Sequence, residues 1–134
     1  MIDGALYSLG DITITNSAEY IGDWVEDLDG MAGATIQVGA AIGTAGAKIQ
    51  VYVQTSLDQG ETAVDIACVT FIADGTPKIL NFSTDGAVTE HVPSDGTMSD
   101  DTMINGILGD RLRMKIVTTG TYANTVVSGR AAVR

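Results

Sequence analysis

The sequence predicts an all-β protein, a single-domain antiparallel β-sandwich of jelly-roll or immunoglobulin-like type with about eight strands. Three observations lead to this class. Apolar and polar residues alternate with a period of two along several segments, Asp-Gly and related turn signals separate these segments, and glycine is abundant at 16 residues. The composition suits short strands and tight turns better than a helical bundle, which would be richer in Leu, Glu and Lys. The 134 residues are a usual length for one domain, so we expect residues 1–134 to form a single unit.

Six segments carry the strand pattern. In chain order they are residues 11–15, 34–42, 47–55, 62–72, 110–118 and 125–133. The alternation is clearest in 110–118, where three apolar residues expected to face the core alternate with three cations expected to face outward: Leu112, Met114 and Ile116 against Arg111, Arg113 and Lys115. Residues 62–72 are apolar on both faces, with Ile66 and Cys68 on the same one, and predict a central strand covered on both sides.

Two segments are less regular. Residues 16–28 place apolar side chains at helical spacing, and Asn16 with Glu19 matches a capping box. Gly22 interrupts that pattern and the surrounding segments are β, so we predict a strand here, with a helix as the alternative. Residues 93–109 predict a long acidic loop, with one short helical turn around residues 101–107. Loops of this length are usually functional or held in place by a neighbour.

Charge is divided unevenly along the chain. All 17 acidic residues lie in residues 1–110, together with two lysines, whereas the last 24 residues carry five cations and no acid. The net charge is therefore −15 for residues 1–110 and +5 for the last 24 residues. The basic strands could pair with acidic strands of the same sheet, or with the acidic face of a neighbouring subunit. For the second interpretation the candidate interface residues are Arg111, Arg113, Lys115, Arg130 and Arg134 on one side and Glu19, Asp23, Glu26 and Asp27 on the other. The net charge of −10 argues against nucleic acid as a partner.

Several kinds of site are not expected. The single cysteine, Cys68, excludes an internal disulfide, and the start of the chain has no signal-peptide pattern, so we expect a soluble protein made in the cytoplasm, without a membrane partner. His91 has no second ligand at metal-binding spacing. Acidic loops such as the one with Asp95, Asp100 and Asp101 lack the order of an EF-hand loop, which leaves calcium binding open. We expect no catalytic residue, no metal site and no cofactor, and therefore no enzyme.

One short motif has the spacing of an Asp-box, the hairpin motif repeated in the propeller blades of sialidases. It consists of Ser56, Asp58, Gly60 and Thr62. The motif occurs once, whereas a propeller needs several blades of roughly 40 residues. We therefore interpret it as a structural turn.

Two further features concern single side chains. Asp65 lies in the middle of an apolar segment, and we expect it to be the cross-strand partner of a basic residue, with a buried carboxylate of shifted pKa as the alternative. Trp24 and Tyr52 are candidates for stacking on a sugar, which would suit a carbohydrate-binding module.

From residue 48 to residue 134 the chain resembles a group of small proteins encoded among the virion structural genes of tailed bacteriophages. The resemblance is carried by four runs: Gln54-Thr55-Ser56-Leu57-Asp58, Asp65-Ile66-Ala67, Gly106-x-Leu108-Gly109-Asp110-Arg111 and Thr119-Gly120-Thr121-Tyr122. Members of the group commonly have Thr-Trp where this chain has Thr62-Ala63, so a packing aromatic is missing from the hairpin here.

The resemblance implies a non-catalytic virion protein located in the particle, which assembles in the host cytoplasm. We expect a capsid decoration or cement protein that binds and stabilises the shell. Its partners would be the major capsid protein or other virion subunits, with a homo-oligomer in the assembled particle. A head–tail connector or tail component is the alternative within the virion. A carbohydrate-binding module that attaches the particle to a host surface is the second alternative.

Overall fold

The computed structural model describes residues 5–15, 18–86 and 90–134, and within these ranges the protein is all-β. The strands are β1 (Ala5–Ile14), β2 (Glu19–Ile21), β3 (Gly33–Ala41), β4 (Lys48–Thr55), β5 (Val64–Phe71), β6 (Lys78–Ser83), β7 (Thr102–Met103), β8 (Leu112–Thr119) and β9 (Thr125–Val133). Among the described residues there is no helix of the length and apolarity needed to cross a membrane.

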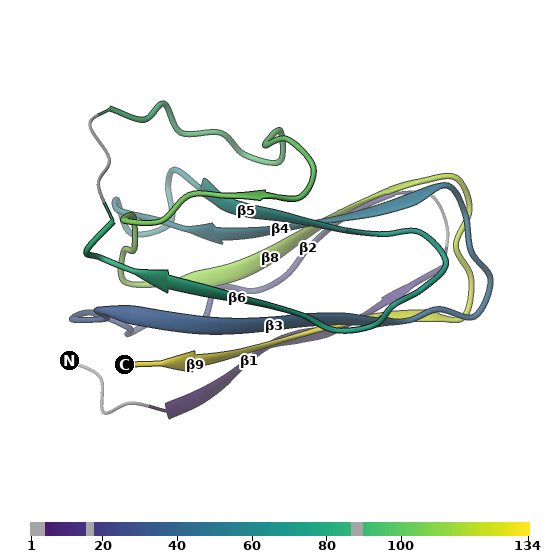
Figure 1. Cartoon of the computed structure of the whole chain (residues 1–134), viewed down its shortest axis with the longest axis horizontal. Coiled ribbons are helices and arrows are strands. Elements are labelled where there is room, and N and C mark those ends of the chain that lie inside the picture. Colours follow the sequence, from purple (N-terminus) through teal and green to yellow (C-terminus); the bar gives the residue numbers. More distant parts are fainter. Residues whose placement is uncertain (1–4, 16–17, 87–89) are drawn as a thin grey trace.

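The strands form two antiparallel sheets that pack face to face (Figure 1). Sheet A has the order β1-β9-β3-β6, and sheet B has the order β2-β8-β4-β5-β7. When the two-residue β7 is left aside and the other eight strands are numbered in turn, the orders become 1-8-3-6 and 2-7-4-5. This is the double Greek-key order of a jelly roll. The predicted β-sandwich is confirmed, and of the two predicted topologies the jelly roll is the one present.

The hydrophobic core lies between the two sheets. Leu112, Met114 and Ile116 of β8 are completely buried in it, as their alternation with the three cations predicts. Burying one such side chain stabilises a fold by about 1.5–3 kcal/mol. Further inward-facing residues come from the neighbouring strands and include Ile36, Val38, Ile49, Val51 and Val53.

Strand β5 departs from simple alternation because of a β-bulge. Val53 of β4 pairs with Ala67, but Gln54 pairs with Asp65, so Ile66 is an extra residue on β5. The bulge turns Ile66 and Ala67 into the core and Asp65 to the outer face of sheet B. Strict alternation along 62–72 therefore assigns the wrong face to part of this strand, since Cys68 does not share a face with Ile66.

Residues 90–110 cross the outer face of sheet B, where Figure 1 shows them as the green trace beside β5. The helical turn expected around residues 101–107 is absent. Instead, β7 pairs with the edge of β5, and the N–H of Ile104 donates to the carbonyl of Ile66 at 2.8 Å. The free edge of β5 offers backbone partners that a helical turn would leave unused.

The segment after residue 17 is extended, as predicted, but only part of it is regular strand. β2 pairs with β8, the N–H of Gly22 donates to Met114 at 2.9 Å, and Val25 forms an isolated bridge with Leu112. The helical alternative is wrong for residues 18–28. The proposed capping residue Asn16 lies outside the described residues.

Candidate functional site

The outer face of sheet B carries a buried polar network centred on Asp65. This side chain has no exposed surface. Its carboxylate accepts hydrogen bonds from the side chains of Gln54 (2.8 Å) and Ser94 (2.9 Å). Three consecutive backbone N–H groups also donate to it, from Gly96 (2.8 and 2.9 Å), Thr97 (3.1 Å) and Met98 (3.3 Å). The partners of Asp65 are therefore two neutral side chains and the backbone of the covering loop, in place of the basic side chain that the sequence suggests.

Gln54 joins Asp65 to the charged residues around it. Its side-chain nitrogen donates to Asp65 and to Asp95, both at 2.8 Å, and its oxygen accepts from Nε of Arg113 at 2.7 Å. Gln54 is completely buried, so each of these bonds replaces one that water would otherwise supply. The amide thus fixes β4, β8 and the loop relative to one another.

Lys115 closes the network at its other end. Its ammonium group lies 3.0 Å from Asp95 and 3.5 Å from Glu19. Burial alone would lower the pKa of Lys115, but the hydrogen bond and charge of Asp95, with the charge of Glu19, outweigh it and raise the pKa above the usual value. Burial raises the pKa of Asp95, but the hydrogen bonds from Gln54 and Lys115 outweigh burial, so the pKa of Asp95 is lower than its usual value. Both groups are therefore held in their charged forms.

Tyr52 and Cys68 lie under the same loop. Tyr52 points to the outer face but is only 3% exposed, so it offers no free ring to a sugar. Burial raises the pKa of Tyr52 to about 12 and that of the Cys68 thiol to about 11. A thiol with so high a pKa is a poor nucleophile at neutral pH. Nearby, Asp100 accepts bonds from Lys48 (2.7 Å) and Gln50 (2.6 Å), which fasten the loop to β4.

Trp24, the other candidate for sugar stacking, is partly buried at the edge of the network. The guanidinium of Arg113 lies over its ring, 4.3 Å from the centroid. One face of the indole is thus occupied by a cation–π contact with the same chain.

The Asp-box-like residues form one hydrogen-bonded turn between β4 and β5. The hydroxyl of Ser56 donates to Asp58 at 2.9 Å and accepts from the N–H of Gly60 at 2.9 Å. Asp58 in turn accepts from the N–H of Thr62 at 2.7 Å, and the bonds from Thr62 and Ser56 lower its pKa. Gln59 and Gly60 take positive φ values of 61° and 91°, which the turn requires.

The candidate interface cations fall into two groups. Those before and within β8 pair with acids of their own chain: Arg111 with Glu26 (3.1 Å) and Asp110 (3.0 Å), and Lys115 as described. The side chains of Arg111, Arg113 and Lys115 are 12, 14 and 9% exposed, so little of them is left for a neighbour.

The second group lies on sheet A. Arg130 is 48% exposed and pairs with Asp11 at 3.0 Å, and Arg134 donates to two neutral residues, Thr35 and Asn81, at 3.2 Å each. On the acidic side, Glu19 pairs with Lys115 of β8 and Glu26 with Arg111 just before it. Asp23 and Asp27 are exposed as well. A role of these residues in subunit contact stays a prediction.

Sequence reasoning missed Gln54 and the donors at residues 94–98. A signal was present, because a carboxylate within an apolar strand must find several donors, and the Asp95-Gly96 turn presents consecutive backbone N–H groups. What the sequence does not give is the bulge that turns Asp65 toward that loop.

Within the described ranges, no group of three or more His, Cys, Asp and Glu side chains is placed to hold a metal ion. Comparison of the chain with protein-family models, with curated proteins and with solved structures finds no match. The fold and the network define the molecule as a jelly-roll β-sandwich in which one outer face is closed by the protein's own loop and the other is not covered by any described segment.

Proposed function

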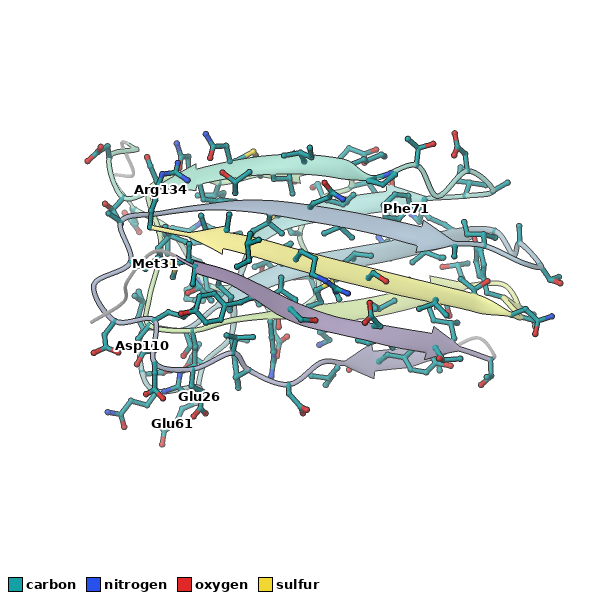
Figure 2. The ribbon with its side chains drawn as sticks, turned by 90° about the horizontal axis from the view of Figure 1, so that it is seen from below. Glu26, Met31, Glu61, Phe71, Asp110 and Arg134 are labelled. Carbon is teal, nitrogen blue, oxygen red and sulfur yellow. The ribbon has the colours of Figure 1, made fainter. Side chains whose placement is uncertain are left out.

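We propose that this protein is a non-catalytic structural protein of a tailed-bacteriophage virion, which decorates the capsid shell and stabilises it. The observation that carries the proposal is the difference between the two outer faces. The outer face of sheet B is covered by residues 90–110 and its cations are paired, whereas no other part of the described chain lies over the outer face of the four strands of sheet A (Figure 2). An open sheet face on a rigid sandwich is a surface on which a second protein can dock.

The open face of sheet A combines apolar and cationic side chains. Leu6 and Ile79 are 81 and 64% exposed. Arg130 lies in the same cross-strand row as Ile79, and Leu6 lies in the neighbouring row. A depression of about 200 Å³ is lined by Leu6, Thr35, Gln37, Ile79, Arg130 and Ala132. Apolar surface with a few cations is typical of protein–protein contact surfaces, in which arginine is enriched.

Electrostatics favour this face for docking on a shell. The chain carries −10 overall, which keeps separate copies soluble before assembly. On the face of sheet A, Arg130 and Arg134 outnumber Asp11, which pairs with Arg130, so this face is less acidic than the rest of the molecule and an acidic surface would repel it least. Complementary charge of this kind sets orientation more than affinity. The resemblance of residues 48–134 to virion proteins and the use of jelly rolls in viral capsids agree with the proposal, the latter as analogy of fold.

The test is the copy number in purified particles, measured by quantitative mass spectrometry against the major capsid protein. A ratio of the same order as the capsid protein, together with a higher melting temperature of expanded capsids on addition of the protein, is the result expected of a decoration protein. A handful of copies would instead favour the connector or tail alternative. Absence from particles would contradict a virion role.

A pair of variants tests which face docks. Arg130→Glu reverses one cation on the face of sheet A, and we expect it to weaken capsid binding at least about tenfold. Lys48→Glu is the matched control, since it changes the net charge equally and also breaks one exposed ion pair, with Asp100. Equal binding by the two variants would argue against docking through sheet A.

A further inference from the structure

We propose that copies of this protein associate head to tail by pairing the two free edges of sheet A, with β1 of one copy adding to β6 of the next. The contact does not depend on the virion role proposed above, since it concerns the purified protein alone. In Figure 2 the two strands form the opposite edges of the sheet, β6 at the top and β1 at the bottom. Within the described part of the chain each pairs with one strand only, β1 with β9 and β6 with β3.

The backbone groups at the β1 edge are available for such pairing. Gly33 of β3 and Arg134, directly after β9, exchange both backbone hydrogen bonds, at 2.9 and 3.0 Å. Hydrogen-bonded and non-hydrogen-bonded pairs alternate along an antiparallel ladder. When this alternation is traced from β3 through β9 to β1, the N–H and C=O groups of Leu6 and Ser8 point away from sheet A.

The β6 edge presents the matching set. At one end of the strand the outward groups of Ser83 are satisfied: its N–H donates to the side chain of Asn105 at 2.7 Å, and its C=O accepts from Gly106 at 3.0 Å. The same alternation turns the backbone groups of Ile79 and Asn81 outward, and residues 105–106 do not reach them. Residues 105–106 thus take the place of a neighbouring strand at Ser83 only, and the outward backbone groups of Ile79 and Asn81 are left for another strand.

Direction and register agree with this pairing. Three antiparallel steps separate β1 from β6, so the two strands run in opposite directions and a following copy in the same orientation would add β1 antiparallel to β6. If Ser8 of one copy lies opposite Ile79 of the next, Leu6 lies opposite Asn81, and the residues of each pair can exchange backbone hydrogen bonds. All four side chains then stay on the outer face of sheet A. Leu6 then lies diagonally next to Ile79, within reach of cross-strand contact.

The side chains favour a second copy as the occupant. Leu6 and Ile79 are large apolar residues, 81 and 64% exposed, placed one at each edge of the same face. Head-to-tail pairing covers both, whereas a symmetric contact of β6 with β6 would leave Leu6 uncovered. A contact between unlike edges can repeat, and it builds a ring or a filament according to the rotation between copies.

The charges beside the two edges also favour a contact between unlike edges. The groove of about 590 Å³ between β1 and β2 is lined by three carboxylates, Asp11, Glu19 and Asp23. The groove of about 430 Å³ beside β6 is lined by both Lys78 and Asp101, whose charged groups lie 3.8 Å apart. The contact therefore joins an acidic side to a side whose two charges balance, which is less repulsive than joining two acidic sides.

The experiment is sedimentation velocity of the purified full chain over a range of concentrations up to about 1 mM, because a small edge contact is expected to be weak. Each copy carries −10, so we expect association to strengthen as salt rises toward about 0.5 M, where screening shortens the reach of repulsion to roughly 4 Å. Leu6→Lys and Ile79→Lys should each weaken association at least about tenfold, since lysine on an edge opposes pairing. Leu57→Lys is the matched control, because Leu57 is 69% exposed and lies in the β4–β5 turn, away from both edges.

Mixing the two edge variants separates this contact from every other. The Ile79→Lys protein keeps an intact β1 edge and the Leu6→Lys protein an intact β6 edge, so the mixture should form dimers and nothing larger, although each variant alone is monomeric. Misfolded variants could not restore a dimer in this way. A monomeric wild type at about 1 mM and high salt, loss in only one edge variant, or equal loss in Leu57→Lys would each overturn the proposal.

Discussion

The backbone N–H of Gly96 points at the carboxylate of Asp65 and lies 2.8 and 2.9 Å from its two oxygens. The relationship joins a β-strand of sheet B to a loop about thirty positions later, and the two backbones also bond directly, since the N–H of Asp65 donates to the carbonyl of Ser94 at 2.8 Å. A buried carboxylate in this setting is stabilised only while the loop is in place. Asp65 therefore acts as the anchor that keeps the outer face of sheet B covered.

Asp65→Asn should be strongly destabilising. The amide keeps one acceptor oxygen but turns an NH₂ group toward a cluster of N–H donors, so bonds to a charged acceptor are lost and donors stay buried without partners. We expect a loss of about 3 kcal/mol in the free energy of unfolding, measured by urea denaturation. Asp85→Asn is the control, since Asp85 is exposed in a turn, and it should change stability by less than about 0.5 kcal/mol. Similar values for the two variants would contradict the anchor role.

The fold could be predicted because its main signals are local. The inward and outward residues of β4 and β8 follow directly from alternation, and the Asp-Gly turns mark where strands end. Strand β6 escapes prediction because its residues are mostly exposed and its apolar Ile79 faces outward beside the inward Leu80, which breaks the alternation. The sequence predicts a helical turn where β7 lies, since a two-residue contact with the edge of β5 is too short to produce an alternating pattern.

The candidate site could be predicted only in part, because it depends on one bulge. The sequence marks Asp65 as a mid-strand carboxylate, but the face on which it lies is set by the extra residue Ile66 opposite Val53 and Gln54. Likewise, the charge pattern predicts which faces carry the cations of β8 but not which acids pair with them. Whether Lys115 meets an acid of its own chain or of a neighbour depends on how the loop with Asp95 folds back, which no local pattern encodes.

Lys115→Met should make the pH dependence of stability visible. The pKa of Asp95 is lowered from its ordinary 3.8, so its contribution is present above that value and is lost as the pH falls through the folded pKa. The pKa of Lys115 is raised from 10.5, so its contribution is present below that value and is lost as the pH rises through the folded pKa. We expect the variant to lose about 1–2 kcal/mol at pH 7, less than for a fully buried pair because Asp95 is half exposed.

The measurement is thermal or urea unfolding of both proteins from acid to alkaline pH. The difference between wild type and variant should be constant near neutrality, and it should shrink at the acid end as Asp95 is protonated and at the alkaline end as Lys115 loses its proton. A constant difference across the whole range would show that the methionine acts through packing and that the ion pair contributes nothing.

Gly109→Ala should be far more damaging than Gly30→Ala. A Cβ at residue 109 would overlap the carbonyl oxygen of Ser56, and the N–H of Gly109 is already held by Thr55 at 2.9 Å, so the backbone has no room to move away. We expect a loss of about 3 kcal/mol or more. Gly30 has a φ of 87° but no atom near the added methyl group, so Gly30→Ala should cost about 1–2 kcal/mol through backbone strain alone. Urea denaturation of both variants ranks them, and the reverse order would contradict the close approach of residues 109 and 56.

Arg113→Lys tests the contact between the network and Trp24. Lysine keeps the charge but loses the planar fork that stacks on the indole and donates from Nε to Gln54 at 2.7 Å. We expect a loss of about 1–2 kcal/mol. Trp24 is the only tryptophan of the chain, so its fluorescence reports on this contact alone, and its emission should shift to longer wavelength in the folded variant as the ring becomes more hydrated.

Arg130→Lys is the matched control for this exchange. Arg130 is half exposed and pairs with Asp11 on sheet A, on the other side of the sandwich, so its replacement should leave the emission unchanged and stability within about 0.5 kcal/mol of wild type. If both variants lost the same stability, the loss would reflect the exchange of arginine for lysine in general. If Arg113→Lys was destabilised with unchanged emission, the bond to Gln54 would be the important one, and the stacking on Trp24 would contribute little.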